Sequence, residues 1–462
     1  MASKASLPRG TRDILPNQMI QREWIMDSLK SSFRSYGFQA IETPAMEKLE
    51  TLTGKYGEEG DRLIFKLLPR GEKLEKVFRA EDLNSAREKL NRNLEEALRY
   101  DLTVPLARFV VQNQNEINFP FKRYQIQPVW RADRPAKGRY REFYQCDADV
   151  IGSKSLWQEV DFIGLYSEVF AKLGLPIEIK MNHRKVLQGI TEKYGVNEHF
   201  GAFTVALDKL DKIGLAGVQK EMTEKDLPEG ALKALELIHN LKGDNRSILN
   251  TLKEELAETE VGIQGLGDLN FVVEACADLN IGAALQLDFT LARGLDYYTG
   301  AIFEVKALDL DLGSIGGGGR YDDLTSIFGL KNMPGIGISF GLDRIQLALE
   351  EKGISCPEDE FSGDFLFVNF GEKEARFSNK LAKQLRGLGL KVELYPDATK
   401  MKKQLDYANR KGIRFVLLIG SEEMEQGIFT LKDMKEGSQR KLGTIELLEA
   451  FNPSQSQDHA KH

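Results

Sequence analysis

Cysteine and histidine are scarce in this sequence. Its three cysteines, Cys146, Cys276 and Cys356, lie far apart and form no CxxC pair. This spacing argues against a zinc knuckle or a disulfide framework, so we expect buried reduced thiols and no protein-bound zinc. Five histidines occur, and none lies in the motifs described below. A catalytic triad or a metal site built on histidine is therefore disfavoured.

Long apolar runs are also missing. The sequence has no uncharged stretch of the length that a membrane helix needs, so we expect no membrane partner. Residues 1–12 place no apolar segment between their basic residues, and they therefore predict neither a secretory signal nor a lipid anchor. A cytoplasmic location is the expectation that remains.

The two commonest phosphate-binding motifs are absent. The sequence has neither a GxxxxGK[ST] loop nor a GxGxxG turn, and Gly335-Ile336-Gly337 is too short to count as one. A nucleotide bound by this chain would instead have to be held by arginines and by ring stacking.

The charge balance is acidic, with 63 Lys and Arg against 70 Asp and Glu, and a net charge of -7. An acidic surface repels a polyanion, which disfavours indiscriminate binding of nucleic acid. Basic stretches at Lys137–Arg141 and Lys400–Arg414 still permit a specific RNA partner.

Hydrophobic residues make up 42% and charged residues 29%, which are ordinary values for a globular protein. A length of 462 residues favours two or three domains over one. Apolar residues spaced by four predict a helix within Met19–Phe33, and Phe38–Pro44 is expected to be a short strand. Phe121–Val129 and Phe143–Ile151 are predicted to be paired strands, joined by a charged hairpin loop.

The later part of the chain changes character twice. The region from about 201 to 279 is rich in Lys, Glu, Leu and Ala and predicts a helical insertion. Gly316–Gly319 is expected to be a turn that allows close backbone approach, and Ile336–Phe340 is expected to lead into a helix at Leu342–Glu350. Beyond Gly363, strands alternate with helices, which predicts a small α/β domain. Its strands are expected at Phe365–Phe370, Val392–Tyr395 and Phe415–Ile419, and its helices at Glu374–Leu388 and Met401–Lys411.

Three stretches could carry chemistry. Residues 130–143, WRADRPAKGRYREF, combine several arginines with an aromatic ring, as a bent triphosphate with a stacked base requires. A solvated charged hairpin is the alternative. The second stretch is residues 291–300, LARGLDYYTG, for which the alternative is a strand and turn with buried tyrosines. The third is residues 335–344, GIGISFGLDR, where the alternative is that the glycines serve packing alone.

Together and in this order, these stretches resemble those of class II aminoacyl-tRNA synthetases, and specifically of histidyl-tRNA synthetases. Leu7–Asp13 looks like the family's opening, and residues 293–300 resemble a motif peculiar to the histidine enzymes. Met19–Pro44 resembles motif 1, Arg123–Ile151 motif 2 and Gly335–Leu349 motif 3.

The resemblance implies an α+β fold. It comprises a catalytic domain at 1–355 with an antiparallel sheet of six or seven strands and the helical insertion at about 201–279, followed by an α/β anticodon-binding domain at 362–453. It also implies a homodimer formed through motif 1.

The resemblance assigns site residues position by position. Arg131 and Arg293 match the catalytic arginines that hold the α-phosphate. The ATP site would also include Asp133, Arg139, Phe143 and Arg344. Histidine would be held by Arg293 together with Asp101, Thr103, Gln145, Asp149, Tyr297 and Tyr298. Candidates for tRNA contact are Arg134 and Lys137 in the motif 2 loop and Lys400, Lys402, Lys403 and Arg410 near the end.

The activity implied is that of a histidine–tRNA ligase, which uses ATP with Mg²⁺, L-histidine and tRNA(His). A regulatory subunit of histidine biosynthesis with the same fold is the alternative, but such a subunit usually lacks the last domain and breaks the motifs. A carboxylate and a phenol on opposite sides of the imidazole could reject apolar rings strongly, because a wrong ligand leaves buried polar groups unpaired. We therefore expect no editing domain.

Overall fold

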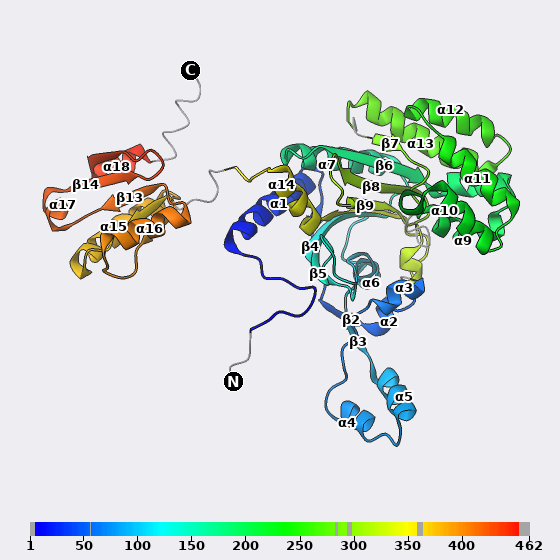
Figure 1. The fold of residues 1–462 in the computed structure, drawn as a ribbon, viewed down its shortest axis with the longest axis horizontal. Helices are drawn as coiled ribbons and strands as arrows, with labels where there is room; N and C mark the ends of the chain where they lie inside the picture. The colour runs from blue at the N-terminus through cyan, green and yellow to red at the C-terminus, as the bar shows by residue number, and fades with distance from the viewer. Residues whose placement is uncertain (1–4, 56, 282–284, 293–297, 358–363, 452–462) are drawn as a thin grey trace. The chain divides into compact units, whose positions relative to one another are not determined.

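The computed structural model describes residues 5–55, 57–281, 285–292, 298–357 and 364–451. The chain divides into two compact units, Met1–Ser355 and Cys356–His462 (Figure 1). Cys146 and Cys276 are buried free thiols, as expected, and Cys356 is a partly exposed one.

The first unit is built on an eight-stranded sheet of order β1-β4-β5-β10-β9-β8-β6-β7. The outer pairs β1–β4 and β6–β7 are parallel and all other pairs are antiparallel, so the predicted antiparallel sheet is confirmed. The strands are β1 (Gln39–Ala40), β4 (Phe121–Trp130), β5 (Glu142–Ile151), β6 (Ile177–His183), β7 (Leu285–Leu287), β8 (Ala301–Ala307), β9 (Ser314–Arg320) and β10 (Gly335–Gly341).

Three helices cover one face of this sheet: α1 (Pro16–Ser35), α7 (Trp157–Lys172) and α14 (Leu342–Lys352). Ile25, Leu29 and Phe33 lie on one side of α1 and are fully buried, as their spacing predicts. The ring of Phe33 packs against Tyr124 of β4 and Phe340 of β10, with centroid distances of 5.2 and 5.9 Å. This face therefore holds the main hydrophobic core.

The other face is only partly covered. Helix α6 (Thr103–Asn113) and the 3-10 helix η2 (Leu324–Phe328) form a smaller apolar cluster with Phe121 and Ile151 near one end of the central strands. The remainder of the face carries polar side chains and is the region in which cavities open.

A small antiparallel pair, β2 (Met46–Lys48) and β3 (Glu96–Leu98), lies beside α6 with α2 (Leu49–Leu52) and α3 (Gly57–Arg62). Beyond it projects a helical hairpin, α4 (Glu72–Phe78) and α5 (Leu83–Asn93), as Figure 1 shows in blue.

The segment after β6 is helical up to Asp278 and gathers at the β6–β7 end of the sheet (Figure 1). Within it, α8 and α13 approach so closely that a Cβ added to Gly189 would lie 2.5 Å from the Cα of Gly262. The elements are α8 (Arg184–Lys193), η1 (Asn197–His199), α9 (Phe200–Leu207), α10 (Leu210–Glu224), α11 (Glu229–Asn240), α12 (Asn245–Glu255) and α13 (Glu260–Asp278).

The prediction of a turn at Gly316–Gly319 was wrong, because these glycines form strand β9. Hydrogen-bonding partners on both sides, β8 and β10, outweigh the low strand propensity of glycine. The missing side chains are still needed: a Cβ at Gly316 would lie 2.9 Å from the Tyr166 ring. The Tyr166 hydroxyl donates to the carbonyl of Gly317 at 3.0 Å.

The second unit has a five-stranded sheet of order β12-β11-β13-β14-β15. Its first three strands are parallel and the last two pairs are antiparallel. Alternate residues of β11 point into different cores, so helices cover both faces, as a small mixed α/β domain requires. The strands are β11 (Phe365–Phe367), β12 (Val392–Leu394), β13 (Phe415–Leu418), β14 (Ile428–Asp433) and β15 (Gln439–Gly443), and the helices are α15 (Glu372–Gly387), α16 (Met401–Lys411), α17 (Ser421–Gln426) and α18 (Thr444–Ala450).

Candidate active site

The floor of the site is the polar face of β5. Because side chains alternate along a strand, Gln145, Asp147 and Asp149 share one face while Cys146 and Ala148 enter the main core. The neighbouring strands continue this polar surface in register. Gln127, Gln125 and Arg123 of β4 lie opposite the three β5 residues on one side, and Gly341, Ser339 and Gly337 of β10 on the other.

Two cavities open above this floor. The larger, of about 440 Å³, extends over the loop between β4 and β5 and the start of α14. The smaller, of about 240 Å³, lies over β5 and β10. They share the lining residues Arg131, Gln145, Tyr298, Gly317, Gly318 and Ser339, so they are neighbouring parts of one site.

Arg131 stands at the junction of the two cavities. Its Nε donates to the carbonyl of Tyr100 at 3.0 Å, and its Nη2 donates to Oε1 of Gln145 at 3.4 Å. The guanidinium lies over the rings of Tyr100 and Phe143, 4.2 and 5.2 Å from their centroids. A planar, permanently charged group fixed in this way is suited to bind an anion from a fixed direction.

The structure places the other ATP candidates around the larger cavity. Asp133, Arg139, Phe143 and Arg344 all line it. Arg139 lies 2.8 Å from Asp133, and Arg344 donates to the carbonyls of Ser314 and Gly138 at 2.7 and 3.2 Å. Arg131 and Arg344, which come from distant parts of the sequence, therefore converge on one cavity. Arg293 and Tyr297 lie outside the described residues.

The opening segment of the chain also reaches this site. The guanidinium of Arg12 lies 2.5 Å from Asp343, the second residue of α14, and stacks over the Tyr140 ring at 4.2 Å. Arg22 of α1 lies 2.8 Å from the same carboxylate. Because of these cations the pKa of Asp343 lies below its usual value despite burial. Asp343 thus ties the start of the chain to the helix that carries Arg344.

The smaller cavity gathers the histidine candidates. Asp101 and Thr103 lie at the N-terminus of α6, where Oδ1 of Asp101 accepts from the backbone N–H of Val104 at 3.2 Å. Both line this cavity with Gln145, Asp149 and Tyr298.

Asp149 is held by two residues that our sequence predictions did not include. Arg123 lies 2.7 Å from its carboxylate, and the Tyr321 hydroxyl donates a short hydrogen bond to it. Burial raises the pKa of Asp149, whereas Arg123 and Tyr321 oppose that rise. The pKa of Tyr321 lies well above its usual value because it is buried beside this negative charge. An arginine within a predicted strand and a tyrosine just after the glycine run are the sequence signals that could have identified them.

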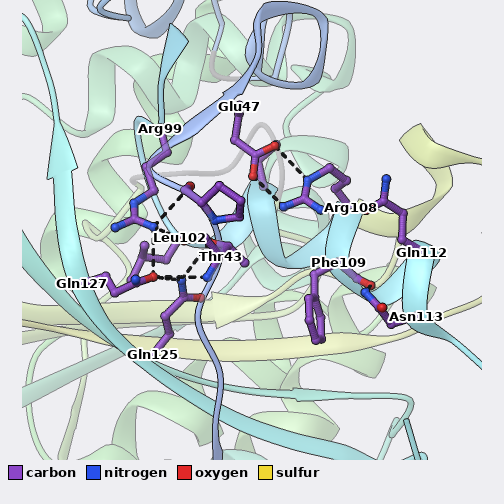
Figure 2. A network of polar contacts seen from close by, with 12 residues as sticks. Thr43, Glu47, Arg99, Leu102, Arg108, Phe109, Gln112, Asn113, Gln125 and Gln127 are labelled. Carbon is purple, nitrogen blue, oxygen red and sulfur yellow. Dashed lines mark hydrogen bonds and ion pairs between the residues drawn. The ribbon is translucent and has the colours of Figure 1, made fainter. Parts of the chain in front are cut away.

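A second buried arginine, Arg99, holds backbone segments that contact Arg131, and Figure 2 shows its contacts with Thr43 and Gln127. The guanidinium of Arg99, which is only 1% exposed, donates to the carbonyls of Thr43 and Pro128 at 2.7 and 2.8 Å and to Oε1 of Gln127 at 2.9 Å. Its own carbonyl accepts from the N–H of Trp130 at 3.1 Å. Arg99 therefore fixes two backbone segments that position Arg131. One is Trp130, which precedes Arg131 in the chain, and the other is Tyr100, whose carbonyl accepts from the Arg131 Nε.

The same network anchors α6. Glu47 of β2 receives two hydrogen bonds from Arg108, at 2.8 and 2.6 Å (Figure 2). This paired contact connects the small β2–β3 sheet to the helix whose N-terminus carries the residues next to the smaller cavity.

None of the tRNA candidates lines either cavity. In the β4–β5 loop, Arg134 is exposed, and Lys137 is paired with Glu351 at 2.5 Å. In the second unit, the candidates at α16 line a hollow together with Asp406 and Asn409. These candidates are Lys400, which immediately precedes the helix, and Lys402, Lys403 and Arg410 within it.

Within the described part of the chain, no group of three or more His, Cys, Asp or Glu side chains is positioned to hold a metal ion. None of the described helices is both long enough and apolar enough to cross a bilayer.

Comparison with known proteins identifies the chain. A family model described as histidyl-tRNA synthetase matches residues 10–345, and an anticodon-binding domain model matches 364–452. The histidine–tRNA ligase of Christiangramia forsetii is 55% identical over 446 residues, covering 96% of this chain and 98% of its own. That of Phocaeicola vulgatus is 50% identical over 449 residues, covering 97% and 99%.

Solved structures agree in fold. A crystal structure of histidyl-tRNA synthetase from Nostoc sp. PCC 7120 matches with a TM-score of 0.82 at 30% identity, covering 97% of this chain and 99% of that one. A Bacillus halodurans protein titled ATP phosphoribosyltransferase regulatory subunit/histidyl-tRNA synthetase matches with a TM-score of 0.71 at 21% identity, over 88% and 97% of the chains. Fold and site together define a class II aminoacyl-tRNA synthetase. Within that class, the chain belongs to the histidyl-tRNA synthetase family.

Proposed function

We propose that this chain activates L-histidine with ATP to give histidyl-adenylate and pyrophosphate, and then transfers the histidyl group to the 3′ end of tRNA(His) with release of AMP. The observation that carries this proposal is the pair of joined cavities. One is lined by arginines and aromatic rings, and the other by carboxylates, hydroxyls and phenols.

In the first step, the α-carboxylate of histidine attacks the α-phosphorus of ATP and pyrophosphate leaves in line. Because charge is redistributed over the phosphate oxygens, the protein has to position the reactants and neutralise that charge. Arg131 at the cavity junction is assigned to the α-phosphate. Arg139 and Arg344 are assigned to the outer phosphates, Phe143 to stacking on adenine and Asp133 to the edge of the base. Arg293 remains assigned to the α-phosphate and the substrate carboxylate.

Mg²⁺ would bind as a complex with the triphosphate of ATP. This ion keeps several waters and binds through one or two carboxylates together with substrate phosphates, so it needs no cage of protein ligands. Three acids line the larger cavity. Asp133 and Asp343 lie within 2.8 Å of arginines, and Glu304 lies 3.6 Å from the Nζ of Lys306. One or two of these three carboxylates would hold the ion, which would screen the charge of the phosphates.

Histidine is assigned to the smaller cavity. Asp149 would accept from one imidazole nitrogen, and a tyrosine would face the other. Tyr297 was our sequence-based choice, and the described tyrosines that line the cavity are Tyr100, Tyr298 and Tyr321. Asp101, Thr103 and Gln145 are assigned to the amino group. A pocket in which every polar group needs a partner discriminates strongly without proofreading, so we propose that no editing activity is present.

The second unit is assigned to the anticodon, with the basic residues of α16 as candidate contacts, and residues 1–355 are assigned to catalysis. We further propose a homodimer formed through motif 1 and a cytoplasmic location. The histidine–tRNA ligases that are 50–55% identical over nearly the whole chain support this function over the alternative, a regulatory subunit with the same fold.

One measurement decides between the two. ATP–pyrophosphate exchange is measured with purified protein and each of the twenty amino acids in turn, followed by charging of tRNA(His). We expect exchange with histidine alone, and charging that depends on tRNA. Absence of histidine-dependent exchange in folded protein would reject the ligase and favour the regulatory role. Hydrolysis of mischarged tRNA would contradict the absence of editing.

A further inference from the structure

Asp147 is a buried carboxylate in the middle of the site to which neither the sequence nor the comparisons assign a role. It lies between Gln145 and Asp149 on the polar face of β5, is 2% exposed and lines the smaller cavity. Among the described residues, its Oδ1 has no hydrogen-bond partner. A buried carboxylate oxygen is costly to leave unpaired, so this atom points to a missing ligand.

The neighbours of Asp147 explain why its charge is not satisfied within the protein. The one fully buried arginine beside it, Arg123, lies 2.7 Å from the carboxylate of Asp149. Ser339, opposite it on β10, donates a hydroxyl hydrogen bond, but this group carries no charge. Asp149 and Asp101 add further negative charge nearby. The cavity therefore has an excess of carboxylates over nearby arginines, which favours a cationic guest.

Burial raises the pKa of Asp147 to about 7, with a smaller contribution from the charge of Asp149 and an opposing one from Arg123. The carboxylate is thus close to half-ionised at neutral pH. A positive charge bound beside it would complete its ionisation.

We propose that Asp147 joins Asp101, Thr103 and Gln145 in binding the α-ammonium group of the substrate amino acid, and that it is a specificity residue for the activation step. The proposal rests on the function proposed above, which places the α-phosphate, and hence the carboxylate that attacks it, near Arg131 and the imidazole near Asp149. Residues two apart on a strand are about 6.5–7 Å apart, so the three β5 side chains present three successive positions along the cavity. In histidine, the ammonium-bearing carbon lies between the carboxylate and the ring. Asp147 is the middle position, and the carboxylate next to it, Asp149, is the one paired with Arg123.

The test is ATP–pyrophosphate exchange with the Asp147→Asn variant, which keeps the shape of the side chain and removes the charge. Losing a hydrogen bond between charged partners should raise the KM for histidine by about 10- to 100-fold, with the KM for ATP within about twofold of the wild-type value. The substrate-free variant should unfold at the same or a higher temperature than the wild type, because the unpaired charge is gone. A structural role for Asp147 would lower that temperature instead.

A substrate analogue identifies the group that is bound. Imidazolepropionate has the ring and the carboxylate of histidine but no amino group, and it is tested as a competitive inhibitor of exchange. We expect its inhibition constant to be equal, within about twofold, for the wild type and Asp147→Asn. An inhibition constant that rises together with the KM for histidine would place Asp147 against the ring and overturn the proposal.

Asp268→Asn provides the matched control. Asp268 is an acid of the same unit that pairs with His183 at 3.3 Å, and neither residue lines the two cavities. This variant should keep the wild-type KM for histidine. If the wild type is active and Asp147→Asn has the same KM for histidine, the role of Asp147 is rejected and the proposed function stands. Absence of histidine-dependent exchange in the wild type would instead reject the proposed function.

Discussion

The guanidinium of Arg123 lies 2.7 Å from the carboxylate of Asp149, and both side chains are almost completely buried beneath the smaller cavity. Removing one partner of a buried pair leaves the other charge without compensation, which typically costs about 3–5 kcal/mol. We therefore expect Arg123→Met to lower the free energy of unfolding by about that amount in urea denaturation. Lys122→Met is the control, because the pair of Lys122 with Asp161 is partly exposed and should contribute less than about 1 kcal/mol. Equal losses in the two variants would contradict the importance of burial.

Replacing Arg131 tests the assignment of the α-phosphate. Arg131→Gln should lower kcat for ATP–pyrophosphate exchange by about 10²- to 10³-fold, as is typical for loss of a preorganised donor to the transition state. Arg134→Gln, three residues further along the same loop, should change exchange by less than about threefold. A loss of similar size in both variants would mean that the loop as a whole, rather than the guanidinium at the cavity junction, is responsible.

Gly337 is the one residue of β10 that faces Asp149 directly. A Cβ at this position would overlap the Asp149 carboxylate, and the β-strand backbone around it could not move away without breaking its pairing. We expect Gly337→Ala to raise the KM for histidine more than 10-fold in the exchange assay. Gly267→Ala, in α13 where an added Cβ meets nothing within 4 Å, should leave the KM unchanged and is expected to be neutral or stabilising. An unchanged KM in Gly337→Ala would show that Asp149 need not occupy its present position.

The binding of histidine should depend on pH through Asp147. Its pKa is raised to about 7 in the protein, so the carboxylate is protonated below that pH and ionised above it. Only the ionised form binds an ammonium group, and the KM for histidine should therefore rise as pH falls from 8 to 6, by up to about tenfold from this residue. The charged or polar neighbours facing it are Arg123 and Gln125 on β4, Asp149 on β5, Ser339 on β10 and Asp101 before α6. Tyr166 of α7 also interacts with it electrostatically.

The free imidazole also titrates near this range, so the comparison is made with Asp147→Asn. The variant should retain only the part of the pH dependence that the substrate ring causes. Identical pH profiles for the two proteins would contradict the titration of Asp147.

Salt separates the two steps of the reaction. Contacts with RNA phosphates release counterions, so charging of tRNA should weaken steeply as salt rises, while ATP–pyrophosphate exchange without tRNA should weaken much less. Replacing Lys402 and Lys403 together with Gln should reduce the salt dependence of charging and leave exchange unchanged. Equal salt slopes for the two assays would argue against phosphate contacts by these lysines.

The sequence by itself determined the elements and the family. Apolar spacing predicted α1, the alternation of strand residues predicted the β4–β5 pair, and the predicted helix Met401–Lys411 coincides with α16. These features are local, because periodicity and turn residues act over a few positions. The order of the motifs was sufficient to identify a histidyl-tRNA synthetase, which the comparisons confirm.

Only the tertiary structure decided which side chains meet. Gly316–Gly319 has the composition of a turn, yet β8 and β10 bind it on both sides and make it a strand. Tyr321 is 172 residues from Asp149 in sequence but donates to its carboxylate, and Arg123 reaches the same group from the neighbouring strand. Partners brought together by strand order leave no periodic signal in the chain. For the same reason, the unpaired oxygen of Asp147 becomes visible only when the sheet is assembled and its neighbours are known.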